Sequence, residues 1–212
     1  MKEDTKLVFE KLKYEIIRCH YYWILYRQLA GTNEGRIDII NKTTPSFFLM
    51  YQDLFFDYIT LELSKLTDPA ELRNFKNLSL FYLLELLKVE VDEKFFEKIE
   101  KILSKLIFET EFFRNRRNKK VAHRDLISAD QTENFGISRQ RVEDALSIVR
   151  EFMNTIEIYF FNNETMYREF ITDLKEDGVA LLINLSKALA YDDLVKQQKI
   201  PIRLWEKYGN VF

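Results

Sequence analysis

The sequence predicts an all-α fold, and three observations support this prediction. The chain of 212 residues contains only five glycines and three prolines, and neither occurs between Ala70 and Phe135. Helices tolerate such a stretch, whereas a fold with many β-turns does not. Apolar residues recur at spacings of three and four, which is the period of a helix. With 47% hydrophobic and 31% charged residues, the chain is expected to be globular and ordered.

The N-terminal part predicts two long helices. The first runs from about Glu3 to Ala30 and ends at the glycine-containing run 31–35. A connector follows, and Pro45 opens the second helix in its first turn. This helix ends near Thr67, because the dipeptide Asp68-Pro69 disfavours its continuation. Its core face is expected to comprise five apolar residues at helical spacing: Phe47, Tyr51, Leu54, Tyr58 and Leu61.

Three more helices are predicted between residues 78 and 160, each with its own N-cap. Asn77 is the expected cap of a short helix that ends at about Lys88, and Asp92 is the expected cap of the next one. After a polar loop, Ser138 caps a long helix. The expected core faces of the last two helices are Phe95, Ile99, Ile102, Leu103, Leu106 and Phe113, and Val142, Leu146, Val149, Met153, Ile156 and Phe160.

The C-terminal residues predict one or two further helices, including 179–189, followed by a tail with Pro201 and Trp205. The loops are short enough for neighbouring helices to run antiparallel. The predicted organisation is a helical bundle over residues 1–165, with a helical extension over residues 166–212 that packs on the same domain.

Compartment and membrane contact can also be predicted from the sequence. Cys19 is the single cysteine, so no intrachain disulfide is possible and a buried thiol in a reducing compartment is expected. The first residues lack the pattern of a signal peptide. No apolar run approaches the roughly 18 residues that cross a bilayer. We therefore expect a cytoplasmic protein with no membrane contact.

One short segment concentrates positive charge in a chain whose net charge is −2. Between residues 114 and 124 there are six basic residues and no acidic ones, and His123 lies among them. The basic residues are Arg114, Arg116, Arg117, Lys119, Lys120 and Arg124. Such runs are commonly solvated helix ends, but the same residues also suit the binding of a polyanion such as RNA.

The residue types in this segment suit cleavage of an RNA phosphodiester. No HExxH, CxxC or EF-hand spacing occurs, so neither a metal nor another cofactor is expected. The His123 imidazole titrates near neutral pH and would act as general base or general acid. The Arg117 guanidinium would stabilise charge on the phosphate oxygens, and the Asn118 amide would orient the phosphate or the imidazole. Attack by the adjacent 2′-OH requires no metal and restricts the substrate to RNA.

The run Arg117-Asn118-Lys119-Lys120-Val121-Ala122-His123 resembles the Arg–polar–x(4–6)–His signature of the HEPN superfamily. The continuation through Arg124-Asp125-Leu126, and the upstream blocks 63–68 and 77–80, resemble its abortive-infection AbiU-type branch. The resemblance spans roughly residues 15–160. It implies a helical bundle that dimerises, with a composite site across the two-fold axis. It also implies metal-independent endoribonuclease activity in phage defence or as a toxin, which leaves room for a cognate antitoxin.

In terms of residues, the resemblance implies that Arg117 and His123 are catalytic, that Asn118 is the supporting polar residue, and that Asp125 orients His123 or pairs with an arginine. The remaining basic residues of the segment would bind the RNA backbone. Two alternatives stay open. In the first, the chain is a catalytically silent HEPN-like module that binds nucleotide, RNA or a protein. In the second, it is a helical scaffold that binds a partner through an exposed aromatic face (Tyr21, Tyr22, Trp23 and Tyr26).

The angular positions of Arg117 and His123 around a helix bear on whether they can act together. At about 100° per residue, Arg117 and His123 lie about 120° apart on an ideal helix. Arg116 would share the face of His123 better, so it is kept as a second phosphate-binding arginine. For Arg117 to act with His123, either the helix must be distorted within the motif or a second subunit must complete the site.

Overall fold

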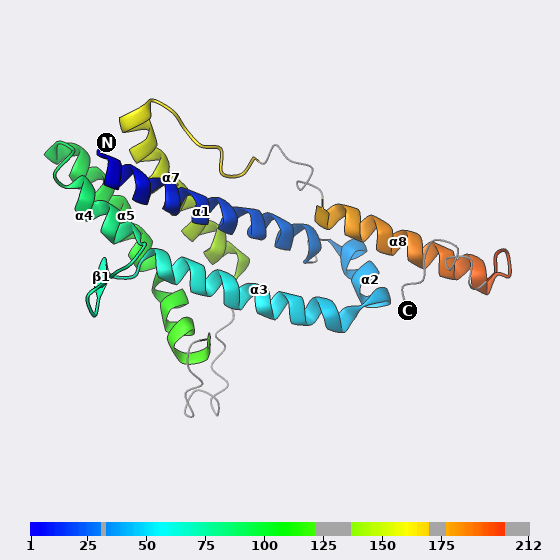
Figure 1. Ribbon diagram of the computed structural model, residues 1–212. Helices are drawn as coiled ribbons and strands as arrows, with labels where there is room; N and C mark the ends of the chain where they lie inside the picture. The colour runs from blue at the N-terminus through cyan, green and yellow to red at the C-terminus, as the bar shows by residue number, and fades with distance from the viewer. Residues whose placement is uncertain (31–32, 122–136, 170–176, 202–212) are drawn as a thin grey trace. The chain divides into compact units, whose positions relative to one another are not determined.

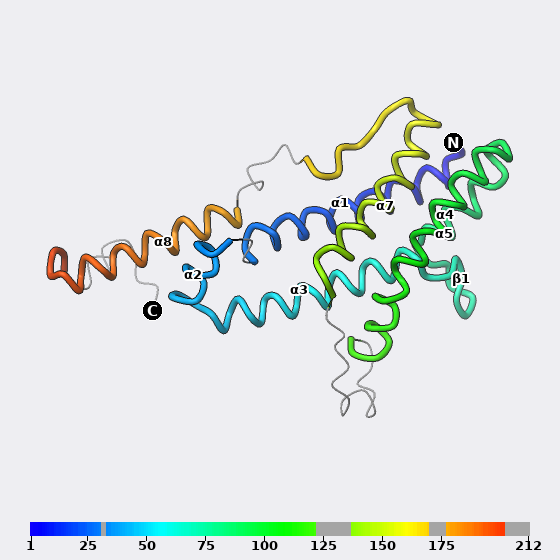
Figure 2. The backbone as a smooth tube through the Cα atoms, turned by 180° about the vertical axis from the view of Figure 1, so that it is seen from behind, coloured from blue at the N-terminus to red at the C-terminus, as the bar shows by residue number. Residues whose placement is uncertain are grey.

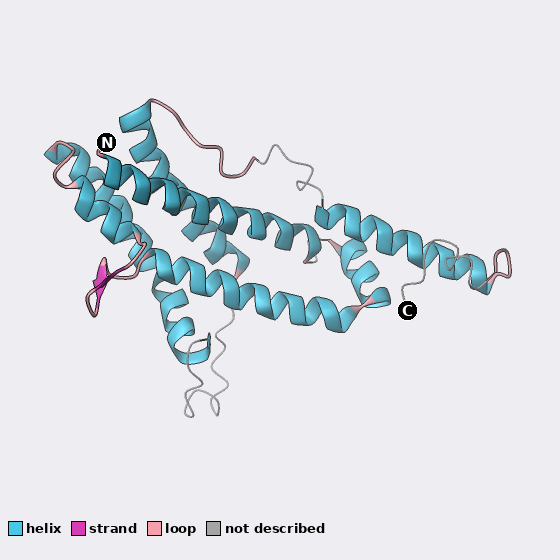
Figure 3. Ribbon diagram, in the orientation of Figure 1, coloured by secondary structure: helices cyan, strands magenta, loops and turns pink. Residues whose placement is uncertain are grey.

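The computed structural model describes residues 1–30, 33–121, 137–169 and 177–201 (Figure 1). Within these ranges the chain forms seven α-helices, one π-helical turn and a two-stranded hairpin, and Figure 3 shows how far helix dominates. The predicted all-α fold is therefore confirmed. The α-helices are α1 (Glu3–Leu29), α2 (Glu34–Thr43), α3 (Pro45–Leu66), α4 (Leu80–Leu87), α5 (Glu93–Arg116), α7 (Arg139–Phe161) and α8 (Asp177–Lys196).

Several helix starts follow the predicted capping chemistry. Pro45 is the first residue of α3. The Asp92 side chain accepts a hydrogen bond from the Phe95 N–H at the start of α5, and Ser138 accepts one from the Arg141 N–H at the start of α7. Each cap satisfies a backbone donor that the first turn of a helix cannot pair internally.

The connector predicted after the first helix is wrong in part, because residues 34–43 form helix α2. The Asn33 side chain caps α2 by accepting a hydrogen bond from the Arg36 N–H at 3.0 Å. The Arg36 guanidinium donates to the carbonyls of Arg27 and Gln28 in the last turn of α1, at 3.2 and 3.0 Å. These contacts satisfy backbone groups at the ends of two helices at once.

Asn77 is not the cap of α4, which is the second correction. Ser79 caps this helix by accepting from the Tyr82 N–H. The Asn77 amide instead donates to the Pro69 carbonyl at 2.7 Å. That bond closes a loop that contains the hairpin β1 (Glu71–Leu72) and β2 (Phe75–Lys76), which the sequence did not predict.

The core face of α3 was also predicted in the wrong phase. Phe47 and Leu54 are 53% and 63% exposed. The buried apolar residues of α3 are Phe48, Phe55, Ile59, Leu63 and Leu66, whereas the other three predicted residues, Tyr51, Tyr58 and Leu61, are half-buried. Because α3 carries apolar residues nearly all round, two stripes show helical spacing, and periodicity cannot say which of them meets the core.

The predicted faces of α5 and α7 are confirmed almost completely. Every predicted core residue is buried except Phe95 and Phe160, which are half-buried. The Phe95 ring lies against Tyr159, with 3.9 Å between the ring centroids. Helices α5 and α7 pack on each other, and Figure 2 shows them from behind. The basic segment begins at the end of α5, so the packing of α5 on α7 fixes where it starts.

The described chain divides into two compact units. The first comprises residues 1–23, α3 from Asp53 on, α4, α5 and α7, and the second comprises residues 24–52 and α8. In the second unit α2 packs on α8, and Leu29, Phe48 and Leu182 form a small core. The predicted division at residues 165 and 166 stays a prediction.

Burial decides two of the sequence hypotheses. Trp23 and Tyr26 are buried, and Tyr21 and Tyr22 are half-buried, so the exposed aromatic face required by the scaffold hypothesis is not formed. Cys19 is buried as predicted, and burial, with Glu62 and Glu15 nearby, raises the pKa of its thiol to about 12. No helix within the described ranges is both long and apolar enough to cross a membrane.

His20 is a second buried titratable group, in α1. Its ring packs on that of Tyr167, with centroids 5.7 Å apart. Burial, with the positive charges of Arg150 and Arg168, lowers the pKa of His20 to about 3. The folded protein therefore holds this imidazole neutral, whereas the unfolded chain protonates it below about pH 6.5.

We predict that His20 makes the protein less stable in mild acid. Between about pH 6.5 and 3 the unfolded chain binds a proton that the folded chain rejects, so the free energy of unfolding falls as the pH falls through this window. Urea denaturation of the wild type and of His20→Gln at several pH values measures the effect. The variant is expected to lose less stability on acidification, and equal losses would contradict the prediction.

Candidate active site

The basic segment begins at the end of α5 and continues into a π-helical turn. Arg114 and Arg116 belong to the last turn of α5, and the π-helical turn η1 comprises Arg117–Val121. The helix therefore carries the segment at its end, as predicted. Short π-helical segments are rare and occur frequently at functional sites.

The change of helix type bears on the phase of Arg117 and His123. The 120° separation holds for an ideal α-helix, and the chain leaves α-helical geometry at Arg117. The chain therefore departs from an ideal α-helix at the first residue of the motif. Ala122, His123, Arg124 and Asp125 lie outside the described residues, so the approach of His123 to Arg117 stays a prediction.

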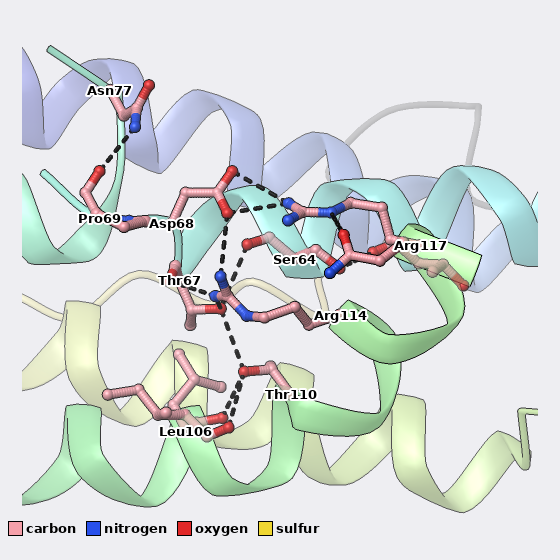
Figure 4. Close-up of polar contacts among 12 residues, drawn as sticks. Ser64, Thr67, Asp68, Pro69, Asn77, Leu106, Thr110, Arg114 and Arg117 are labelled. Atoms are coloured by element: carbon pink, nitrogen blue, oxygen red, sulfur yellow. Dashed lines mark hydrogen bonds and ion pairs between the residues drawn. The ribbon is translucent and has the colours of Figure 1, made fainter. Parts of the chain in front are cut away.

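Asp68, which follows the end of α3, accepts hydrogen bonds from two arginines of the basic segment (Figure 4). Arg117 Nη1 donates to Asp68 Oδ1 at 2.9 Å and to Oδ2 at 3.2 Å. Arg114 Nη1 donates to Oδ1 at 3.3 Å. The spacing of three places both arginines on one side of α5, and the carboxylate compensates part of their mutual repulsion.

Arg114 is anchored a second time, at the neighbouring Thr67. Its Nη2 donates to the Thr67 carbonyl and, at 2.8 Å, to the Thr67 hydroxyl. The hydroxyls of Thr67 and Thr110 lie 3.2 Å apart, and Thr110 also donates to the Leu106 carbonyl at 2.8 Å. Both threonines are buried. This network joins the end of α3 to α5. It also places a cation at the C-terminal end of α3, where the last carbonyls have no donor within the helix.

Asn118 holds the other edge of the Arg117 guanidinium. Arg117 Nε donates to Asn118 Oδ1 at 3.2 Å, while Nη1 is bound to Asp68. Arg117 Nη2 makes no hydrogen bond within the described residues. The side chain of Arg117 is 18% exposed, so the guanidinium is oriented from two sides and still reaches the surface.

Arg116 lies in a different environment. Its side chain is 7% exposed, and Nη2 lies 2.5 Å from Asp57 Oδ1 of α3. Lys119 and Lys120 are exposed. Of the basic residues proposed to contact RNA, these two lysines and the partly exposed Arg114 lie at the surface, whereas Arg116 is buried in an ion pair. Within the described ranges, no group of three or more His, Cys, Asp or Glu residues could hold a metal ion.

Comparison with known families agrees with this helical architecture. A family model described as AbiU2, for the HEPN_AbiU2 domain, matches residues 2–181. The chain belongs to the AbiU2 branch of the HEPN superfamily. The resemblance inferred from the motif is thereby confirmed, and the match reaches from α1 into α8. No curated protein and no solved structure matches the chain significantly.

Sequence reasoning missed the two carboxylates that pair with the arginines of this AbiU2-family chain. Asp57 and Asp68 are separated by eleven positions in the sequence, about three helical turns. Asp57 lies between the apolar residues Phe56 and Tyr58 of α3, and a charge at such a position is a usable signal for an ion-pair partner. Nothing in the sequence says that the partner comes from α5.

We predict that Asp57 stabilises this HEPN fold by compensating the buried Arg116. Asp57→Ala is expected to lower the free energy of unfolding by about 1–3 kcal/mol, because the buried guanidinium of Arg116 then loses the Asp57 carboxylate. Asp57→Ala combined with Arg116→Met is expected to recover much of the loss, since neither charge remains. Urea denaturation measures both. Asp53→Ala, an exposed change on the same helix, is the control, and a double variant no more stable than Asp57→Ala would refute the explanation.

Proposed function

We propose that this HEPN-family chain is a metal-independent endoribonuclease that acts in phage defence or as a toxin. The observation that carries the proposal is the position of Arg117 in the motif Arg117-Asn118 to His123. Its guanidinium is oriented by Asp68 and Asn118 and remains partly exposed. Such preorganisation at the surface suits the binding of a phosphate whose negative charge increases during reaction.

The proposed reaction needs only the RNA and the side chains of the motif. A base removes the proton of the ribose 2′-OH, and the oxygen attacks the adjacent phosphorus. The bond from phosphorus to the 5′ oxygen breaks, and an acid protonates the leaving oxygen. The products are a 2′,3′-cyclic phosphate and a 5′-OH. His123 serves as the base or as the acid, and Asp125 is proposed to orient it.

The remaining cations are proposed to bind the RNA backbone. Arg117 would contact a non-bridging oxygen of the scissile phosphate, and the exposed Lys119 and Lys120 would contact neighbouring phosphates, together with Arg124. Arg114 is paired with Asp68, just after α3, and Arg116 with Asp57 of α3, so they contribute positive potential more than direct contact. We also propose that the active form is a homodimer with two copies of the motif at its two-fold axis.

We predict that the purified protein cleaves labelled RNA in excess EDTA and leaves 2′,3′-cyclic phosphate ends. His123→Ala and Arg117→Ala are each expected to lower the cleavage rate about a hundredfold or more, because each removes a group that acts in the transition state. Electrophoresis of the products measures the rate, and RNA with a 2′-deoxy residue at the cleavage site should stay intact.

Arg73→Ala is the matched control, because Arg73 is an exposed arginine outside the basic segment. Cleavage that persists in His123→Ala would refute the mechanism. RNA that stays intact with the wild type, while nucleotide, RNA or a protein binds, would identify the silent module instead. If Arg117 and His123 of one site come from different subunits, mixing the two inactive variants should restore part of the activity.

A further inference from the structure

Asp68 occupies a fixed position at the end of α3. Its own N–H donates to the Lys65 carbonyl at 3.1 Å. The next residue is Pro69, whose φ is restricted by its ring, and the Pro69 carbonyl accepts from the Asn77 amide at 2.7 Å. The backbone is therefore held on both sides of Asp68, and its carboxylate offers a rigid reference point to α5.

The two arginines bound to this carboxylate are held differently. Arg114 also donates to Thr67, both to the carbonyl and to the hydroxyl. Among the described residues, Arg117 makes no hydrogen bond to the backbone of α3, and it is hydrogen-bonded to Asp68 just after that helix. Loss of the Asp68 charge would leave Arg114 anchored, while Arg117 would keep, among the described residues, its bond to the exposed Asn118.

We propose that Asp68 is a positioning residue, which fixes the Arg117 guanidinium for contact with the scissile phosphate while Arg114 braces α5 against α3. This inference rests on the proposed function for its catalytic consequence. The hold of Asp68 on Arg117 is testable by itself. One carboxylate between two guanidiniums leaves this trio with a net charge of +1, so the site still attracts a phosphate.

A positioning role and a purely structural role predict different results for Asp68→Asn. The amide keeps the shape and one acceptor oxygen but loses the charge that holds Arg117. If Asp68 positions Arg117, the rate at saturating RNA falls, because misplacing a reacting group by about 1 Å can cost a hundredfold. RNA affinity should stay the same or increase, since a negative charge near the phosphate has been removed. A purely structural role would instead weaken binding, rate and stability together.

We predict that Asp68→Asn lowers the single-turnover cleavage rate about tenfold to a hundredfold. The dissociation constant for a 2′-deoxy-blocked RNA should stay within about threefold of the wild type. The matched control is Asp53→Asn, which removes one exposed carboxylate from α3 and should leave both values unchanged. Asp68→Glu is the second variant, because it keeps the charge that supports folding and displaces the carboxylate by one methylene. Its rate should lie between those of the wild type and Asp68→Asn, and wild-type rates in both variants would overturn the proposal.

A measurement that needs no cleavage separates this inference from the proposed function. Phenylglyoxal modifies accessible arginines, and mass spectrometry of the digested protein reads each site. Arg117 should react faster in Asp68→Asn than in the wild type, and Asp53→Asn should show no change. Unchanged Arg117 reactivity in Asp68→Asn overturns the positioning role. A wild type that leaves RNA intact, combined with faster Arg117 labelling in Asp68→Asn, refutes the ribonuclease and keeps the structural hold of Asp68.

Discussion

Three arginines within four positions at the end of α5 repel one another, and two carboxylates, one in α3 and one just after it, compensate this repulsion. Arg114 and Arg117 bind Asp68, and Arg116 binds Asp57. Like charges so close together repel strongly at low dielectric, so a packed helix end with this sequence requires carboxylates from another element. Asp57 of α3 and Asp68 just after it provide these carboxylates, and the buried hydroxyl pair of Thr67 and Thr110 lies beside Arg114.

The same ion pairs separate structural arginines from a candidate functional one. Arg116 is buried, and a buried charge is tolerated only with a partner. The second amino group of Arg114 donates to Thr67, which follows the last residue of α3. Within the described part of the chain, Arg117 is oriented by the side chains of Asp68 and Asn118, and it reaches solvent at the start of a π-helical turn. Neighbouring residues of identical chemistry thereby acquire different roles.

The wider fold provides a rigid support for this end of α5. The helix packs along α7 through faces that are buried almost throughout, and both helices start at side-chain caps. A site on a well-packed helix is held more accurately than a site on a loop. The match of residues 2–181 to the AbiU2 model agrees with this helical frame, whose motif follows α5 directly.

The sequence by itself determined the described α-helices other than α2, three helix starts and the core faces of α5 and α7, because amphipathic period and capping are local properties. It also located the basic segment, and its motif indicated the family. Only the tertiary structure decided which stripe of α3 is buried, since that helix is apolar on nearly every side. Residues 34–43 form a helix that sequence reasoning missed, although its Asn33 cap is a local signal. Tertiary structure also paired Asp57 and Asp68 with arginines about fifty to sixty positions away. Pairing at such separations depends on how helices pack, and no local pattern in either segment records it.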